Sequence, residues 1–279
     1  MNPLVSIITP TYNRAYILGT AIKSVLAQTY KNWEMIIVDD GSTDATKKLV
    51  ESFHESRIHY HHISHGGPSR ARNLGLEQAK GEWIVYLDSD NDYLPEFLET
   101  ILQRVFQSPS VLFGIAKATK MLELYINSKL VKTIDHSDNY PETLSVTDIF
   151  HRKLIVDMNG FFHHRKIIED GIRFDEDFGK CEDWDFIFNI CNQYPDHFLY
   201  INQVLLNYHQ RYGGDGAVSN STYRDWAVMY KKLYEKYRHS KLMKGQDWYP
   251  YRVDKWNELA DQFEKGLLPP YYLYYFQNK

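Results

Sequence analysis

Residues 85–92 read VYLDSDND, an apolar strand that runs directly into three alternating carboxylates. Side chains at alternate positions of an extended chain point the same way, so Asp88 and Asp90 are expected to face one point, and Asp92 too if the extension persists. Packed carboxylates repel one another unless a cation lies among them. Carboxylates without thiolates suit a hard ion such as Mg²⁺ or Mn²⁺, which commonly also binds substrate phosphates. The stretch therefore indicates a metal–diphosphate site.

Three other interpretations of this stretch stay open. Its three aspartates and Glu99 match ligand positions of an EF-hand calcium loop, but Tyr93 stands where that loop needs glycine, and a β-rich run precedes it instead of a helix. Aspartate-nucleophile phosphatases also begin with Asp-x-Asp after a strand, but they have Thr or Val where this chain has Asp92. The simplest alternative is a solvated acidic turn.

Outward from this stretch, the first hundred residues alternate between strand and helix patterns. Strands are predicted at 4–8, 35–38, 57–63 and 83–87, and helices after residue 17, up to residue 53 and over 68–79. This alternation predicts a parallel sheet with right-handed crossovers, in which ligands bind beyond the carboxyl ends of the strands. The loops at 9–14, 39–44 and 88–92 are therefore expected to share one rim.

Composition limits the class of protein. A chain of 279 residues is long enough for one large α/β domain with an appendage. The net charge of −4 gives no general reason to bind nucleic acid. Cys181 and Cys191 alone make no disulfide framework, which favours the reducing cytoplasm. We expect no membrane span, because no apolar run reaches about 18 residues, and no signal peptide, because the chain opens on a strand.

Five motifs, one of them within the stretch at 85–92, follow one another in a fixed order. They are VSIITPTYNR at 5–14, VDDGSTD at 38–44, ARNLG at 71–75, LDSDND at 87–92 and EDWD at 182–185. Their order and spacing resemble glycosyltransferase family 2, from residue 3 to about residue 210. The resemblance implies the α/β GT-A fold, with a Rossmann-like, mostly parallel sheet flanked by helices. It also implies a nucleotide-sugar donor, a divalent metal and inversion at the anomeric carbon.

The same resemblance suggests how the chain is divided. We expect a catalytic domain over 1–221, with a nucleotide-binding half at 1–110 and an acceptor-binding half at 111–221. A helical, aromatic-rich extension would occupy 222–279.

The resemblance assigns ten residues to the donor site: Thr9, Pro10, Tyr12, Arg14, Asp39, Asp40, Arg72, Asp88, Ser89 and Arg211. Within this set, Tyr12 would stack on the base, and Asp39 would accept a hydrogen bond from its ring N–H, a contact that suits uracil. Arg72 would lie near the diphosphate or ribose. Neither glycine-rich phosphate-binding motif is present, so polar side chains would have to hold a nucleotide.

A metal, Mn²⁺ or Mg²⁺, is implied with Asp90 as its main ligand and with Asp92 and His209 as further ligands. The family often has Asp-x-Asp-Asp, whereas this chain has Asn91 after Asp90, which leaves the role of Asp92 open. His209 follows an apolar strand at 204–208 and precedes a predicted loop at 210–216. The alternative for this histidine is an ordinary surface residue at a strand end.

A candidate catalytic base lies in the second half of the chain. Glycosyl transfer needs a carboxylate that takes the proton of the acceptor hydroxyl, and the resemblance gives that role to Asp183. Its neighbours Glu182, Trp184 and Asp185 would bind the acceptor. Because the motif enters a helix, we expect the helix N-terminus to stabilise the ionised form of Asp183. The alternative is that these acids only cap the helix.

The C-terminal region differs in composition. Residues 224–255 contain nine Lys or Arg against four acids, with aromatic residues at helical spacing. This pattern suits an anionic membrane surface, but it also suits an aromatic face that packs on the catalytic domain. The apolar tail at 267–276 is expected to dock on the body of the protein, on the membrane or on a second subunit of a homo-oligomer.

These observations predict a metal-dependent inverting transferase. It would move a hexosyl or N-acetylhexosaminyl group from a UDP-sugar to a hydroxyl of a glycan or lipid-linked acceptor. Transfer would be non-processive, because the Gln-x-x-Arg-Trp motif of processive synthases is absent. Its location would be cytoplasmic, with peripheral contact at the inner face of the membrane. A sugar-phosphate nucleotidyltransferase and a non-catalytic nucleotide- or sugar-binding module are the alternatives.

Overall fold

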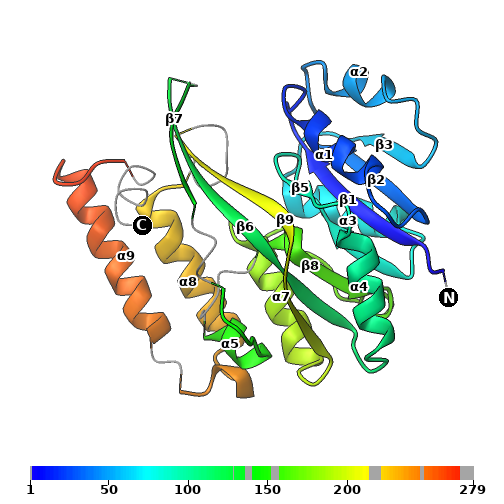
Figure 1. Ribbon diagram of the computed structural model, residues 1–279. Coiled ribbons are helices and arrows are strands. Elements are labelled where there is room, and N and C mark those ends of the chain that lie inside the picture. The colour runs from blue at the N-terminus through cyan, green and yellow to red at the C-terminus, as the bar shows by residue number, and fades with distance from the viewer. Residues whose placement is uncertain are drawn as a thin grey trace.

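The computed structural model describes residues 2–127, 129–135, 140–151, 157–213, 221–245 and 248–270. Within these residues the strands form one nine-stranded sheet in the order β3-β2-β1-β4-β8-β6-β9-β5, with β7 paired to β6 (Figure 1). The strands are β1 (Val5–Thr11), β2 (Trp33–Asp39), β3 (Ile58–His62), β4 (Trp83–Tyr86), β5 (Asp92–Tyr93), β6 (Phe113–Ile126), β7 (Lys129–Asp135), β8 (Phe161–His164) and β9 (Phe198–Tyr212).

The helices cover the faces of the sheet or extend beyond it. They are α1 (Leu18–Leu26), α2 (Thr46–Glu51), α3 (Pro68–Gln78), α4 (Phe97–Phe106), α5 (Val146–Phe150), α6 (Lys166–Glu169), α7 (Glu182–Gln193), α8 (Tyr223–Tyr237) and α9 (Trp248–Glu264), with short 3₁₀ turns η2 (Met158–Gly160) and η3 (Lys241–Met243). The first four strands are mutually parallel, so the predicted alternation of strand and helix is confirmed.

Alternation along each buried strand builds two cores. Ile7 and Ile37 belong to the cluster under α1 and α4, whereas their neighbours Ile8 and Ile36 belong to the cluster with α3 and α7. Successive side chains of a strand point to opposite faces, which is why a continuous apolar run fits a sheet covered on both sides. The first strands are thereby fixed between two helical layers, and their carboxyl ends emerge at one edge.

Beyond β4 the sheet becomes mixed. Strand β8 is antiparallel to both β4 and β6, while the long strands β6 and β9 run parallel. The pairing of Met121 with His209 and of Leu124 with Tyr212 extends β9 past the predicted strand end. The prediction of a loop beginning at residue 210 is therefore wrong: His209 and Arg211 lie within a strand, because β6 supplies a partner for their backbone. The rest of that predicted loop, residues 214–216, lies outside the described residues.

The C-terminal helices α8 and α9 lie side by side beyond α7 (Figure 1). Helix α8 begins with a capping box, in which Thr222 and Asp225 each bond the backbone N–H of the other. Tyr230 and Tyr237 are buried in the same core as α7, so the aromatic face packs on the body of the protein. In the described part of the chain, no helix has both the length and the apolar character needed to cross a bilayer.

The predicted tail begins against the body. Leu268 packs on the core, and the Tyr223 hydroxyl donates to the carbonyl oxygen of Pro269 at 2.9 Å. Residues 271–276 of this predicted docking segment lie outside the described residues.

Candidate active site

A pocket of about 540 Å³ opens beyond the carboxyl ends of the parallel strands. Its walls combine the three predicted loops with the start of α3, the start of α7 and strand β9. The lining residues are Pro10, Thr11, Tyr12, Asn13, Arg14, Asp40, His65, Gly67, Pro68, Ala71, Arg72, Asp88, Ser89, Asp90, Asn91, Glu182, Tyr208, His209, Gln210 and Arg211. The convergence of the three loops on one rim is therefore confirmed.

The acidic stretch does not stay extended. The backbone N–H of Asn91 donates to the Asp88 carbonyl oxygen at 3.1 Å, which closes a turn directly after β4. Asp88 and Asp90 line the pocket, whereas Asp92 begins β5 and accepts a hydrogen bond from the Asn207 amide at 2.8 Å. Asp88 and Asp90 thus share one pocket, whereas Asp92 leaves it because the turn ends the extension on which its inclusion depended.

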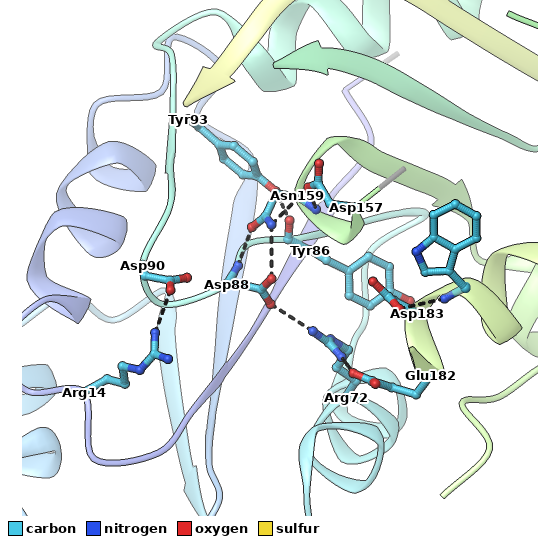
Figure 2. A network of polar contacts seen from close by, with 11 residues as sticks. Arg14, Arg72, Tyr86, Asp88, Asp90, Tyr93, Asp157, Asn159, Glu182 and Asp183 are labelled. Carbon is cyan, nitrogen blue, oxygen red and sulfur yellow. Dashed lines mark hydrogen bonds and ion pairs between the residues drawn. The ribbon is translucent and has the colours of Figure 1, made fainter. Parts of the chain in front are cut away.

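Asp88 lies at the centre of a polar network (Figure 2). Its Oδ1 accepts from Arg72 Nη2 at 3.0 Å, and its Oδ2 accepts from Asn159 Nδ2 at 3.1 Å. The other guanidinium nitrogen, Arg72 Nη1, lies 2.7 Å from Glu182 Oε1. Arg72 is only 6% exposed, so this guanidinium bridges the carboxylates of β4 and α7 with little competition from water.

Asp90 has arginine partners of its own. Its Oδ2 lies 2.7 Å from Arg14 Nη1 and 3.5 Å from Arg211 Nη1. Burial raises the pKa of Asp90 above the ordinary aspartate value, and the Arg14 charge opposes that rise. The first loop and β9 thus bring two cations to one carboxylate.

His209 lies between two carboxylates. Its Nδ1 lies 2.9 Å from Glu123 Oε1, and its Nε2 lies 3.4 Å from Asp92 Oδ2. The hydrogen bond with Asp92 is the main cause of a raised pKa at His209.

The donor set fits a divalent cation only in part. Among the described residues, no group of three or more His, Cys, Asp or Glu side chains is arranged to hold a metal ion. The predicted shell of Asp90, Asp92 and His209 is therefore not assembled, because Asp92 and His209 pair with each other. Asp88 and Asp90 remain, and Mg²⁺ is commonly bound by one or two carboxylates together with substrate phosphates and water.

Asp183 stands at the first turn of α7, next to the pocket-lining Glu182. Its Oδ1 accepts the backbone N–H of Trp184 at 2.8 Å, and α7 begins after Cys181, whose φ of 62° is left-handed. Burial, followed by the charge of Glu182, raises the pKa of Asp183 to about 7. Burial and a like charge therefore oppose the stabilisation of the ionised form that is expected at the helix N-terminus.

The model of Glycosyl transferase family 2 matches residues 6–167. The chain belongs to this family. An uncharacterized glycosyltransferase of Rickettsia bellii is 29% identical over 249 residues, which cover 84% of this chain and 34% of that protein. A GalNAc(5)-diNAcBac-PP-undecaprenol beta-1,3-glucosyltransferase of Campylobacter jejuni is 38% identical over 116 residues, covering 40% of this chain and 38% of that protein.

Solved structures agree with the fold of the family 2 chain. The crystal structure of TarS residues 1–349 from S. aureus, in complex with UDP-GlcNAc, has a TM-score of 0.67 and 19% identity, over 93% of this chain and 72% of that chain. This likeness confirms the predicted GT-A fold. The matches span about a third of each of the two curated relatives described above, so those proteins contain much that this comparison does not cover.

In this family 2 chain, the first two loops are only partly at the surface of the pocket. Thr9 is fully buried and does not line it, whereas Pro10 and Tyr12 do. The Tyr12 ring stacks on His65 with ring centroids 4.5 Å apart. One face of the Tyr12 ring, which is predicted to stack on a base, thus has an aromatic neighbour.

The two aspartates after β2 differ in position. Asp39 is 1% exposed and does not line the pocket, and its carboxylate accepts from the Tyr60 hydroxyl and from the Ser42 N–H. Asp40 lines the pocket and accepts the N–H groups of Gly66 and Gly67, both at 2.8 Å. Asp40 therefore shapes the loop before α3.

The predicted acceptor residues are divided between the pocket and the interior. Ser89, assigned to the donor, and Glu182 both line the pocket, whereas Trp184 is buried against Phe188. Asp185 is 2% exposed and accepts from Lys236 Nζ and the Tyr237 hydroxyl, each at 2.8 Å. The structure thus places Asp185 at the anchor of α8 rather than in the pocket.

Three residues of this site escaped prediction from the sequence. Asn159 contacts Asp88 from 71 positions away, Glu123 contacts both His209 and Arg211 from β6, and His65 stacks on Tyr12. Asn159 and Glu123 lie in no recognised motif. Only His65 could have been assigned to the site from its place in the sequence, because it follows β3 and lies just before the motif that begins α3.

Proposed function

We propose that this chain transfers a sugar from a nucleoside-diphosphate donor to an acceptor hydroxyl, with inversion at the anomeric carbon. One observation carries the proposal: Asp183, a carboxyl whose pKa burial raises, directly follows Glu182 at the edge of a pocket that Arg14, Arg72 and Arg211 line. A general base works best with a pKa near the operating pH. Guanidinium groups suit the diphosphate that departs.

In the proposed reaction, the acceptor oxygen bonds to the anomeric carbon as the bond from that carbon to the diphosphate oxygen breaks. The proton of the hydroxyl passes to the Asp183 carboxylate. The arginines of the pocket stabilise the negative charge that develops on the leaving diphosphate. Arg72 also holds Glu182 at 2.7 Å, which keeps the start of α7 in register with the donor carboxylate Asp88.

We further propose a divalent cation, Mn²⁺ or Mg²⁺, held by Asp90 with Asp88. When bound, it would supply positive charge against the leaving diphosphate. The Arg14 contact at 2.7 Å keeps the Asp90 carboxylate oriented. His209 and Asp92 would act through their mutual contact and through Glu123, which also lies 3.3 Å from Arg211.

For substrates we propose a UDP-sugar of hexosyl or N-acetylhexosaminyl type and a glycan or lipid-linked acceptor. The structurally similar TarS is described with UDP-GlcNAc, and the Campylobacter relative is named for an undecaprenol-linked acceptor. We propose that the chain adds one or a few sugars during the synthesis of a cell-envelope polysaccharide, at the cytoplasmic face of the membrane. The aromatic face of α8 packs inward, so a peripheral contact would have to use the outer side of that helix.

The test is the thermal stability of the protein with Mn²⁺ and a panel of nucleoside diphosphates and nucleotide sugars, repeated with Asp90→Ala. Binding to the folded state raises the melting temperature by mass action. We expect a metal-dependent rise with uridine nucleotides that Asp90→Ala loses. Incubation with sugar phosphate and UTP checks the nucleotidyltransferase alternative. Absence of any shift, with no transfer from any donor, would contradict the proposal.

A further inference from the structure

Asn159 lies in the η2 turn and has no exposed surface. Its Oδ1 accepts the backbone N–H of Asp88 at 2.7 Å, and its Nδ2 donates to Asp88 Oδ2 at 3.1 Å. The same Nδ2 donates to Asp157 Oδ1 at 3.1 Å, and Asp157 Oδ1 also accepts the Asn159 backbone N–H at 2.8 Å. One carboxamide thus contacts both the main chain and the side chain of Asp88 (Figure 2).

The chemistry of these contacts allows only one orientation of the amide. An ionised carboxylate only accepts hydrogen bonds and a backbone N–H only donates, so the amide oxygen must face the N–H and the NH₂ group must face the carboxylates. Two neighbouring carboxylates would repel each other without a donor between them. Asn159 supplies that donor for Asp88 and Asp157, which no hydrophobic or acidic residue of similar size can do.

The turn that carries Asn159 is held close to the sheet. A Cβ atom placed on Gly160 would lie 2.5 Å from the Ala116 carbonyl oxygen of β6, so the backbone approaches too closely for any other residue. The position of the carboxamide is therefore fixed by the fold before any ligand binds. Such rigidity in the residues that support a ligand-binding group lowers the cost of binding.

We propose that Asn159 is the positioning residue of the donor site, which fixes the Asp88 carboxylate so that its other oxygen meets Arg72. The proposal rests on the proposed function. Through Arg72, the fixed Asp88 also sets the position of Glu182 and of the start of α7. Asn159 itself acts only through Asp88, because it is buried beneath the pocket and does not line it.

The test compares Asn159→Ala and Asn159→Ser with Gln28→Ala. Gln28 is a matched control, since it is equally buried and its carboxamide bonds the backbones of Ser24, Leu94 and Leu98. The dissociation constant of UDP is measured by calorimetry with Mn²⁺, and the exchange of the Asp88 amide hydrogen is measured without ligand. Both Asn159 variants are expected to weaken UDP about tenfold, as for a lost hydrogen bond to a charged group, and to speed exchange at Asp88.

The control should lose a similar amount of thermal stability with no change in UDP affinity. Asn159 variants that bind UDP like the wild type, with unchanged exchange at Asp88, would overturn the inference alone. A wild-type protein that binds no nucleotide would overturn the proposed function and this inference together. If Asn159→Ala fails to fold, Asn159→Ser carries the comparison, because its hydroxyl is small and polar.

Discussion

The pocket has two acidic pairs, and their surroundings differ. The turn after β4 presents Asp88 and Asp90, each in contact with an arginine at 3.0 Å or less. The start of α7 presents Glu182 and Asp183, and Arg72 contacts only the first of them. Among the described residues, Asp183 has no ion pair, and its carboxylate accepts the N–H of Trp184. Arginines thus contact both carboxylates of one pair and only one carboxylate of the other.

This difference shows that tertiary partners outweigh local structure in setting charge. Asp183 has the favourable position, at a helix N-terminus, which contributes about 0.3–1 kcal/mol at exposed sites. Burial and Glu182 nevertheless raise its pKa to about 7. Arg72 directs Nη1 to Glu182 and Nη2 to Asp88, and its charge lowers the pKa of Asp183 by less than burial and Glu182 raise it. Under the proposed function, the distribution of three arginines over the pocket would separate donor binding from acid–base chemistry.

The largest expected effect is on the unpaired carboxyl. Asp183→Asn should lower kcat by about 10²–10⁴-fold, the usual contribution of a general base, while the affinity for UDP stays the same. Kinetics and calorimetry measure the two quantities separately. Asp185→Asn is the control, because this acid in the same helical turn bonds Lys236 and Tyr237 of α8 and should lose stability but keep UDP affinity. Unchanged transfer by Asp183→Asn would remove the functional contrast between the two pairs.

For Asp90, the carboxylate paired with Arg14, we expect a change in UDP affinity and little change in turnover. Arg14→Gln removes the cation 2.7 Å from Asp90 and should weaken UDP by about 10–100-fold, the range for a hydrogen bond to a charged group. Turnover at saturating donor should change much less. Arg224→Gln, whose parent residue bonds Asp261 and Glu264 of α9, controls for the loss of an arginine elsewhere. A large fall in kcat with normal UDP affinity would contradict this assignment.

The pH profile tests whether the charge of Glu182 raises the pKa of Asp183. For the wild type, kcat/KM should fall as the pH drops below about 7, because the base becomes protonated. Glu182→Gln removes a like charge and releases Arg72 from one of its partners, and both changes lower the pKa of Asp183. The acidic limb of kcat/KM should therefore move to lower pH. A limb that stays in place would show that Glu182 does not tune the base.

The smallest expected effect is on stability. The pKa of Asp183 is raised from 3.8 to about 7, so the folded state binds more protons than the unfolded state in this window. Stability contributed by the protonated form is lost as the pH rises through the window. Asp183→Asn should therefore have a higher melting temperature than the wild type at pH 8, and little advantage at pH 4. Equal differences at both pH values would argue against a raised pKa.

The parallel half of the fold was predictable because its signals are local. Apolar runs such as residues 4–8 and 83–87, each followed by a polar loop, are enough to define strands whose carboxyl ends meet at one edge. Prediction from local sequence patterns failed where contacts with a distant segment, or a turn, decide the backbone conformation. Strand β9 continues through Arg211 only because β6 supplies its backbone partner. The turn at Asp88–Asn91 likewise removes Asp92 from the pocket.

The sequence by itself determined the family and the parallel layers, and it brought Arg14, Asp88 and Asp90 to one rim because they follow strand ends. Arg72 and Glu182, which lie on helices, were assigned only through the family motifs. The tertiary structure alone decided which cation meets which carboxylate. It joined Asn159 to Asp88 and Glu123 to Arg211 across 71 and 88 positions of the chain. Pairing at such separations depends on how the sheet closes and on how much water the site excludes, and neither is written in any local pattern.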